Sequence, residues 1–361
     1  MSYGIVNADQ IGTSVQGYSL GAGNSSLLKN KIINGACVID QRNAGASVTP
    51  TAGQFTLDRY AFQVSQTSKL TCQQNAGSVT PPIGFSNYLG ITSSSAYSVT
   101  STDFFFLYQV IEGFNSADLQ WGTANAKTVT LSFQVYSSLT GTFSGSFRNN
   151  AGNRSYPFTY TVSLANTWTT ISITVAGDTT GTWVGATNGK GIFLTFGLGS
   201  GPTRLGTANS WQAGDFDGAT GSVSVVGTSG ATFYITGVQL EVGSSATGFE
   251  YRQYQQELAL CQRYYQVVGS LSGYASSTTV VQMAVPMFVS MRASPTVGAT
   301  GVLATTDGSA NYTESSVTFG GSLDPRGGPM SIGNFTGLTA NRPMILNPGV
   351  NGNYMTLSAE L

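Results

Sequence analysis

The sequence predicts an all-β protein. Three observations support this: apolar residues alternate with Thr and Ser in short runs, glycine-rich turns separate the runs, and helical spacing occurs in one segment only. We expect an antiparallel β-sandwich over residues 33–245, a short linking helix over 249–266 and a smaller C-terminal β-domain over 267–361. Residues 1–32 precede these elements as an extended segment.

The composition excludes several classes of function. Only 9% of the 361 residues are charged, and 15 basic against 16 acidic side chains leave a net charge of −1. Binding to nucleic acids or to membrane surfaces needs a concentration of Lys and Arg that this chain lacks. The absence of His removes Ser-His-Asp and Cys-His catalysis and His metal sites. We therefore expect no metal, no cofactor and no nucleic-acid partner.

The first element is the extended segment over residues 1–32. It is rich in Gly, Ser and Asn, and thinly scattered apolar residues such as Ile5 and Val15 are too few to build a core. The N-terminus lacks the basic and apolar regions of a signal peptide, and no apolar run approaches the ~20 residues of a membrane-spanning helix. We expect synthesis in the cytoplasm without membrane insertion.

The sandwich is predicted from strands with one apolar face. Apolar residues occupy alternate positions in 128–136, 170–175 and 192–198, and polar residues fill most positions between them. Turn-forming runs such as 177–181 and 188–191 separate these strands, which favours an antiparallel sandwich over an α/β sheet. The three cysteines lie far apart in the sequence, so we expect buried thiols and neither disulfides nor a Cys-based zinc site.

One strand near the end of the sandwich contains a change in the alternation. Phe233 and Ile235 share one face, whereas Val238 and Leu240 reach that face only if one residue is inserted between the pairs. Gly237 lies at this change, and a glycine inside a strand pattern is typical of a β-bulge. The alternative is two separate strands.

The linking helix is predicted from one stripe of large apolar residues. Its members recur at spacings of 3, 4, 3 and 4 residues: Tyr251, Tyr254, Leu258, Cys261 and Tyr265. Two interpretations carry equal weight: the stripe packs on the adjacent sandwich, or three copies meet along it around an axis. Two heptads are too short to hold an oligomer alone.

The C-terminal β-domain has very little charge. Residues 267–361 contain seven charged side chains, and apolar residues alternate around Pro286 at Met283, Val285 and Met287. Strand edges without charges are prone to pair with other chains. Burial of these edges between subunits therefore favours an oligomer.

Several stretches of the sequence resemble those of one family. They include K-I-I-N-G-A at 31–36, F-Y-I-T-G-V-Q-L-E-V-G at 233–243 and F-E-Y-R at 249–252, with 27–30, 39–43, 56–60, 257–265 and the opening G-I-V-N-A-D. Together they are similar to bacteriophage tail-fibre and related virion-fibre proteins with a jelly-roll domain of the carbohydrate-binding-module type. The resemblance covers residues 1 to about 267 and includes no catalytic signature.

The resemblance implies a homotrimer that is a component of the virion, as a tail or capsid appendage. Such fibres are attached to the particle by the N-terminus, and their distal end faces the host surface. The attachment residues would then be Tyr3, Ile5, Val6, Ile11 and Val15. The implied partners are other virion proteins and a host-surface glycan, which several weak sites would bind together.

Candidate glycan-binding residues follow from the chemistry of sugar recognition. Aromatic rings stack on sugar faces, and amides and charged groups bind the hydroxyls around them. The candidates in predicted loops are Trp121, Trp183, Trp211, Asn149, Asn150 and Arg154. The alternative is that each Trp is a core or loop anchor, because Trp side chains are usually largely buried.

Two other functions stay open. One is a head-fibre, capsid-decoration or tail-collar protein that binds only virion proteins. The other is a polysaccharide depolymerase, which needs two acids that face each other across a cleft. The nearest candidates, Asp215 and Asp217, lie two positions apart in one loop, where such neighbours more often bind solvent or a structural cation. We expect no enzymatic activity.

Overall fold

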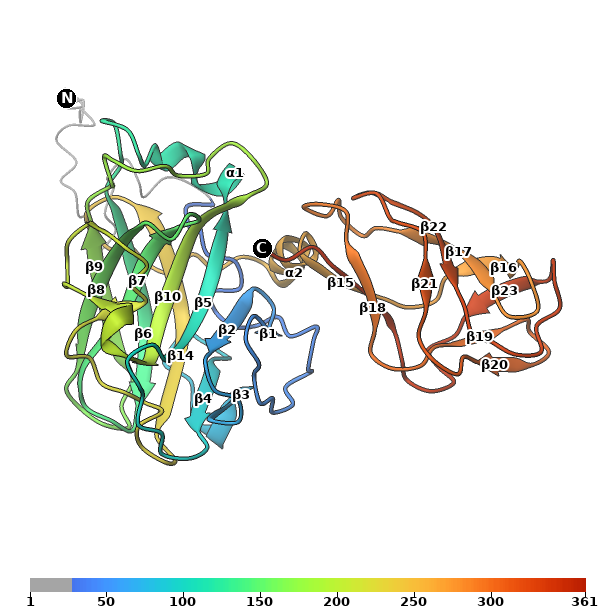
Figure 1. Cartoon of the computed structure of the whole chain (residues 1–361), viewed down its shortest axis with the longest axis horizontal. Coiled ribbons are helices and arrows are strands. Elements are labelled where there is room, and N and C mark those ends of the chain that lie inside the picture. Colours follow the sequence, from blue (N-terminus) through green and yellow to red (C-terminus); the bar gives the residue numbers. More distant parts are fainter. Residues whose placement is uncertain (1–27) are drawn as a thin grey trace, which may run out of the picture. The chain divides into compact units, whose positions relative to one another are not determined.

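The computed structural model describes residues 28–361, which fold into two compact units (Figure 1). Unit 1 ends at Arg252, and unit 2 begins at Gln253. The predicted attachment residues lie outside the described residues: Tyr3, Ile5, Val6, Ile11 and Val15. Each unit is described below by itself.

Unit 1 is a sandwich of two antiparallel β-sheets (Figure 1). The larger sheet has the strand order β1 (Phe55–Leu57), β2 (Tyr60–Val64), β5 (Phe104–Glu112), β10 (Lys190–Ser200), β7 (Gly141–Asn149), β8 (Arg154–Val162) and β12 (Gln212–Ala213). The smaller sheet has the order β3 (Leu70–Gln74), β4 (Leu89–Ser93), β14 (Thr232–Val242), β6 (Val129–Ser137) and β9 (Thr169–Val175). A short parallel pair consists of β11 (Leu205–Gly206) and β13 (Gly218–Ala219). The predicted all-β, jelly-roll sandwich is confirmed.

The two sheets meet through large buried side chains. The ring of Phe133 in β6 lies 5.2 Å from that of Phe196 in β10 and 5.1 Å from that of Tyr160 in β8. All three rings are buried, and burial of one such side chain stabilises a fold by about 1.5–3 kcal/mol. The alternation in the sequence therefore identified β6, β9 and β10 correctly.

Strand β14 contains the predicted bulge. It runs without a break from Thr232 to Val242, and its register with β6 shifts between Thr236 and Gln239. Gly237 has a φ of 63°, and a Cβ at this position would lie 2.6 Å from Cζ of Phe85. A single bulged strand, and not two separate strands, explains the change of alternation.

The chain belongs to unit 1 from its first described residues, which corrects the predicted boundary between residues 32 and 33. Ile32 is fully buried in the sandwich core, and Asn30 is buried as well. The side chain of Gln109 in β5 exchanges two hydrogen bonds of 2.9 Å with the backbone of Ile33. Residues 28–33 are therefore part of the sandwich and not of the extended segment.

Unit 2 consists of helix α2 (Tyr254–Gln262) and two antiparallel sheets. One sheet has the order β15 (Tyr265–Val268), β24 (Met355–Ser358) and β18 (Thr296–Ala299). The other has the order β20 (Asn311–Thr313), β19 (Ala304–Thr306), β23 (Pro343–Leu346), β16 (Ser272–Ala275), β17 (Val281–Pro286), β22 (Gly327–Ile332) and β21 (Phe319–Gly320). Met283 and Val285 lie in its core, as their alternation predicts.

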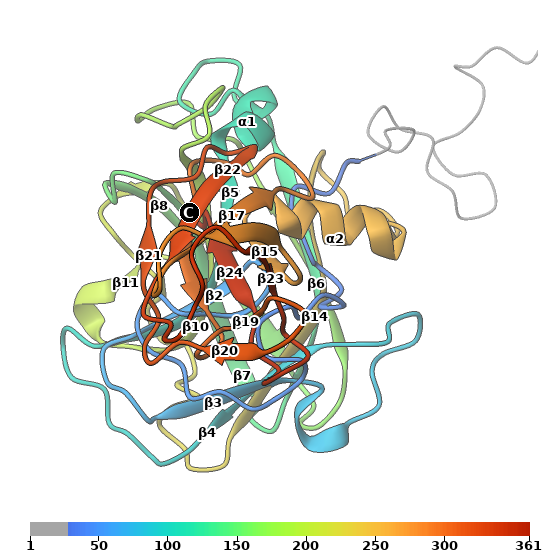
Figure 2. The same cartoon turned by 90° about the vertical axis from the view of Figure 1, so that its right-hand side faces the viewer.

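Helix α2 is shorter than the helix predicted over 249–266 (Figure 2). Gln253 has an extended backbone conformation, and Tyr251 before it belongs to unit 1. Tyr265 is the first residue of strand β15. The regular spacing of apolar residues thus continues past both ends of the helix and overestimates its length.

The other helical segments of the described residues are short. They are α1 (Gly113–Ser116) and the 3₁₀ turns η2 (Ala76–Ser78), η3 (Ala117–Leu119) and η4 (Pro202–Arg204). Among residues 28–361, no helix has the length and apolar character that crossing a membrane requires.

Candidate functional site

The three tryptophans predicted to bind glycan form one cluster in unit 1. Trp121 follows η3, Trp183 lies in the loop between β9 and β10, and Trp211 precedes β12. The ring centroids lie 4.9 Å apart for Trp121 and Trp183, 5.3 Å for Trp121 and Trp211, and 5.4 Å for Trp183 and Trp211. All three pairs are edge to face, which is a favoured geometry of aromatic contacts.

The cluster uses its own hydrogen-bond donors internally. The indole N–H of Trp121 donates to Lys127 O at 2.9 Å, and that of Trp211 donates to Ala176 O at 2.7 Å. Trp121 is only 6% exposed. The cavity beside Trp121 and Trp183 has a volume of about 40 Å³, which is close to the space of one water molecule and too small for a sugar ring. The structure thus supports the alternative in which these tryptophans are anchors.

The polar candidates near the cluster also have internal partners, with one exception. Asn149 is buried, its Oδ1 accepts from the backbone N–H groups of Asn153 and Arg154 at 3.1 Å, and its Nδ2 donates to Thr182 O at 3.0 Å. These bonds close the turn between β7 and β8. Asn150 at the tip of that turn is exposed.

Arg154 holds the carboxylate of Asp178 in a bidentate pair. Its Nε and Nη2 donate to the two carboxylate oxygens at 2.9 and 2.6 Å. Burial alone would raise the pKa of Asp178, but hydrogen bonds from Arg154, Thr180 and Trp183 outweigh it and keep the pKa below its usual value. Asp178 is therefore charged at neutral pH and anchors the loop that carries Trp183.

Asp215 and Asp217 form an ion network with two arginines. Arg204 donates to Asp215 Oδ2 and Asp217 Oδ2 at 2.8 Å, and Arg148 donates to Asp215 Oδ1 at 2.6 Å and also to Asp217. The guanidinium of Arg148 lies 5.2 Å from the ring centre of Phe106. The two carboxylates share the same cations and do not face each other across a cleft, as a glycosidase pair would.

All three cysteines are buried thiols. Cys37 and Cys72 are buried free thiols, and burial raises the pKa of each to about 12, so both stay protonated. Cys261 is also buried. In the part of the chain that the structure describes, no group of three or more Cys, Asp or Glu side chains is placed to hold a metal ion.

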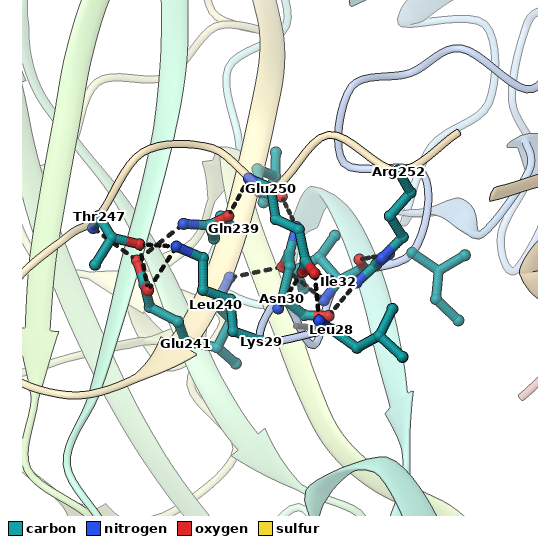
Figure 3. Close-up of polar contacts among 12 residues, drawn as sticks. Leu28, Lys29, Asn30, Ile32, Gln239, Leu240, Glu241, Thr247, Glu250 and Arg252 are labelled. Carbon is teal, nitrogen blue, oxygen red and sulfur yellow. Dashed lines mark hydrogen bonds and ion pairs between the residues drawn. The ribbon is translucent and has the colours of Figure 1, made fainter. Parts of the chain in front are cut away.

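A second polar cluster joins the first described residues of unit 1 to its last ones (Figure 3). We call it the polar clamp, and it consists of residues 28–32 and residues 238–252. Asn30 is central, because its Oδ1 accepts from Ile32 N at 2.9 Å and from Leu240 N at 3.0 Å. Lys31 N adds a backbone bond to Leu240 O at 2.8 Å.

Glu250 and Arg252 bind the incoming chain from the other side. The carboxylate of Glu250 accepts from Asn30 N at 2.8 Å and from Leu28 N (Figure 3). Arg252 donates to Ile32 O at 3.1 Å and to Asn30 O, and it lies 3.5 Å from Glu250. Charged side chains thus bind four backbone groups of residues 28–32, and neutral partners such as Leu240 bind others.

Glu241 completes the polar clamp. Its buried carboxylate accepts from Thr247 N at 2.8 Å and Thr247 Oγ1 at 2.6 Å, and from Gln239 Nε2 at 2.9 Å. Lys29 Nζ lies 3.6 Å from Glu241 and also donates to Thr247 Oγ1. These contacts fold the segment after β14 back against the incoming chain.

The predicted oligomer residues do not share one helical face. Tyr251 is exposed, and its ring lies 4.9 Å from that of Phe249 and 5.5 Å from that of Phe85. The five residues stand as follows: Tyr251 in unit 1, exposed Tyr254, half-buried Leu258 and buried Cys261 in α2, and buried Tyr265 in β15. Neither Tyr251 nor Tyr265 is helical, so the predicted stripe does not exist as a surface.

Comparison with known proteins finds no protein-family model and no curated protein that matches the chain. Solved structures do match. One is the enzymatically active domain of tailspike protein 4 from bacteriophage CBA120, at 13% identity over 60% of this chain and 22% of that chain, with a TM-score of 0.31. The match therefore spans about a fifth of the tailspike chain.

Two further structures match nearly along their whole length. A protein from Bacteroides thetaiotaomicron, described as a "putative sugar binding protein", has 13% identity, covers 59% of this chain and 100% of its own, and has a TM-score of 0.34. A family 11 carbohydrate-binding module of a Clostridium thermocellum cellulase has 11% identity, covers 57% and 99%, and has a TM-score of 0.27. All these TM-scores are low, so the fold assignment rests on the strand pairings given above.

Proposed function

We propose that the protein is a bacteriophage virion fibre, attached by its N-terminal segment, that recognises a host-surface glycan through several copies of the chain. The observation that carries the proposal is the polar clamp. Within unit 1, the chain from residue 28 and the chain to residue 252 are bound to each other directly. An appendage that is fixed at one end and binds at the other needs such a link.

The mechanical consequence follows from the hydrogen bonds. Tension between residues 28 and 252 loads the contacts of Glu250 and Arg252 with the incoming chain first. These bonds involve charged groups, which are about twice as strong as bonds between neutral groups. The polar clamp also includes residues of strand β14, such as Leu240, so tension that passes the contacts of Glu250 and Arg252 would next load this strand.

Glycan recognition is proposed from the low charge of the chain and from the pairing of its acidic side chains. With a net charge of −1 and few ionic side chains, the surface favours an uncharged partner rather than a polyanion. Weak contacts at single sites become firm when several copies bind one surface together, and a homotrimer provides such copies. The ion network of Asp215 and Asp217 supports a binding protein rather than a hydrolase.

The test is the location of the protein on virus particles. Immunogold electron microscopy of particles that carry the intact chain should show label on an appendage. A chain that lacks residues 1–27 should fold but be absent from particles, whereas the Asn150→Ala variant, changed at an exposed turn, should assemble normally. Particles without label on any appendage would contradict the proposal, and decoration by the shortened chain would contradict N-terminal attachment.

A second function is favoured by one observation. The indole N–H groups of the tryptophan cluster bond within unit 1, Trp121 is buried, and Trp183 and Trp211 are half-buried, so the predicted site has no fully exposed aromatic ring. Unit 1 would then be a structural part, as in a head-fibre, capsid-decoration or tail-collar protein. Label on the particle together with no glycan binding by the intact protein would favour this function.

A further inference from the structure

Unit 2 contains a large open hollow on its seven-stranded sheet. The hollow has a volume of about 810 Å³, within the range of small-molecule sites, and follows β16, β17 and β22. Its lining includes Ser272, Tyr274, Gln282, Ala284, Pro286 and Pro329. No residue that lines the hollow carries a charge.

One aromatic side chain of the hollow is open to solvent. Tyr274 is 49% exposed, and its hydroxyl makes no hydrogen bond with any residue that the structure describes. It is the register partner of Gln282 in β17 and Pro343 in β23. The tryptophans of unit 1 differ in both respects, because their rings pack together and their N–H groups are bonded internally.

An oriented amide lies next to this ring. Gln282 Nε2 donates to Ser331 Oγ at 2.7 Å, across the pairing of β17 with β22. This bond fixes the amide, so its Oε1 stands as an acceptor for a hydroxyl donor. Ser272 on the same strand as Tyr274 is exposed and offers a hydroxyl group.

We propose that the hollow binds a neutral saccharide chain, with Tyr274 as the surface on which a sugar ring stacks. The site rests on the proposed glycan recognition and gives it a location and a ligand class. The apolar C–H face of a sugar fits the ring of Tyr274 and the neighbouring prolines, and its hydroxyls fit Gln282 and Ser272. A lining without cations offers no partner for the acidic groups of sialic or uronic acids or of sugar phosphates.

A second copy of the chain fits this surface less well. A contact between copies, whether two-fold or three-fold, must fill the hollow with a convex patch of the other copy, or it leaves a void. A slender polymer of sugar rings enters an open hollow and contacts its floor along three strands. The shape of the hollow therefore favours the saccharide over a contact between copies.

The test compares matched variants of the intact protein on a printed array of neutral and acidic oligosaccharides. Wild type should bind neutral glycans, and Tyr274→Ala should bind them at least about tenfold more weakly. Tyr354→Ala is the matched control, because Tyr354 is a 40% exposed tyrosine of unit 2 outside the hollow. Ala284→Trp fills the hollow from an exposed position and should block binding without removing a core contact.

The other possible outcomes distinguish the proposed site from the proposed function. Equal binding by wild type, Tyr274→Ala and Ala284→Trp would place glycan binding elsewhere and leave the proposed function intact. Selective binding of acidic glycans would contradict the assignment of the binding site to the uncharged hollow. No binding to any glycan would overturn both proposals. A smaller assembly of Tyr274→Ala in light scattering would show that the face joins copies of the chain.

Discussion

Trp121 illustrates how hydrogen-bond partners decide whether an aromatic side chain is available to a ligand. Its N–H is bonded to Lys127 O, and its ring is packed against two other indoles and Phe147. Tyr274 has the opposite situation, with an open ring and a hydroxyl that bonds no described residue. The sequence alone gives no sign of this difference.

The first prediction concerns the tryptophan cluster. Trp121→Ala should lower the free energy of unfolding by about 3–5 kcal/mol, because it leaves a cavity among packed rings. Asn150→Ala, at an exposed position, should change it by less than about 0.5 kcal/mol. Urea denaturation followed by far-UV circular dichroism measures both. A small loss for Trp121→Ala would contradict its role as an anchor.

The second prediction concerns Glu314 in unit 2. Its Oε1 accepts from Leu303 N at 2.8 Å, whereas Oε2 is buried without a hydrogen bond in the described residues. Burial raises the pKa of Glu314 from 4.5 to about 7. The folded state therefore keeps its proton where the unfolded chain has lost it, and stability should fall as pH rises from about 4.5 to 7, by about 3 kcal/mol in all.

Calorimetric unfolding of the intact protein between pH 5 and pH 8 tests this. Wild type should have a lower transition temperature for unit 2 at pH 8 than at pH 5. Glu314→Gln keeps an acceptor for Leu303 N and removes the titration, so its transition should depend less on pH and should lie above that of wild type at pH 8. The same pH dependence in both proteins would refute the assignment.

The sequence could identify the tryptophans as candidates but not their role, for a physical reason. Residue type and loop position identified Trp121, Trp183 and Trp211 as candidates, and the three do lie together. What decides their role is the position of acceptors such as Lys127 O and Ala176 O, which the fold brings close. Tyr274 was missed because a single tyrosine in an alternating strand has no distinctive pattern.

Among the strands, the bulge in β14 requires glycine at position 237 for two reasons, which are its backbone conformation and the close approach of Phe85. Its φ of 63° favours glycine, and Phe85 occupies the space next to its Cα. Gly230 has a φ of 74° but no heavy atom within 4 Å of where a Cβ would lie. Substitutions at the two glycines therefore distinguish two free-energy costs: that of a left-handed backbone conformation with a Cβ, and that of the contact with Phe85.

The third prediction uses this pair. Gly230→Ala should destabilise unit 1 by about 1 kcal/mol, the cost of a left-handed conformation with a Cβ. Gly237→Ala should cost more, by about 1–3 kcal/mol, because Phe85 must also move. Denaturant unfolding of both variants measures the difference. Equal losses would show that the contact with Phe85 is unimportant.

Strands were easier to predict than the helix and the polar clamp. Alternation reports burial directly, which is why β6, β9, β10 and the bulge in β14 were found. The stripe from Tyr251 to Tyr265 has helical spacing, but only Tyr254–Gln262 is helical. The clamp joins residues that are more than 200 positions apart, such as Asn30 and Glu250, and no local pattern contains such a pairing.

At the scale of the whole molecule, the chain is two β-rich units that meet in sequence after Arg252. The fall in charge after the helix predicted a second domain from residue 267, whereas unit 2 begins at Gln253 and includes helix α2. The fourth prediction is that the intact protein is a homotrimer, with a mass in light scattering of three chains of 37.6 kDa. A monomer at micromolar concentration would contradict recognition through several linked copies.

Recognition of a glycan on the surface of the host cell is the proposed function of this protein. The most direct measurement is the adsorption of phage particles to the bacterial strain on which they grow, in the presence of excess purified intact protein. The account predicts that wild type and Tyr354→Ala reduce adsorption, whereas Tyr274→Ala at the same concentration does so far less. Adsorption that is unchanged by excess wild-type protein would contradict the claim.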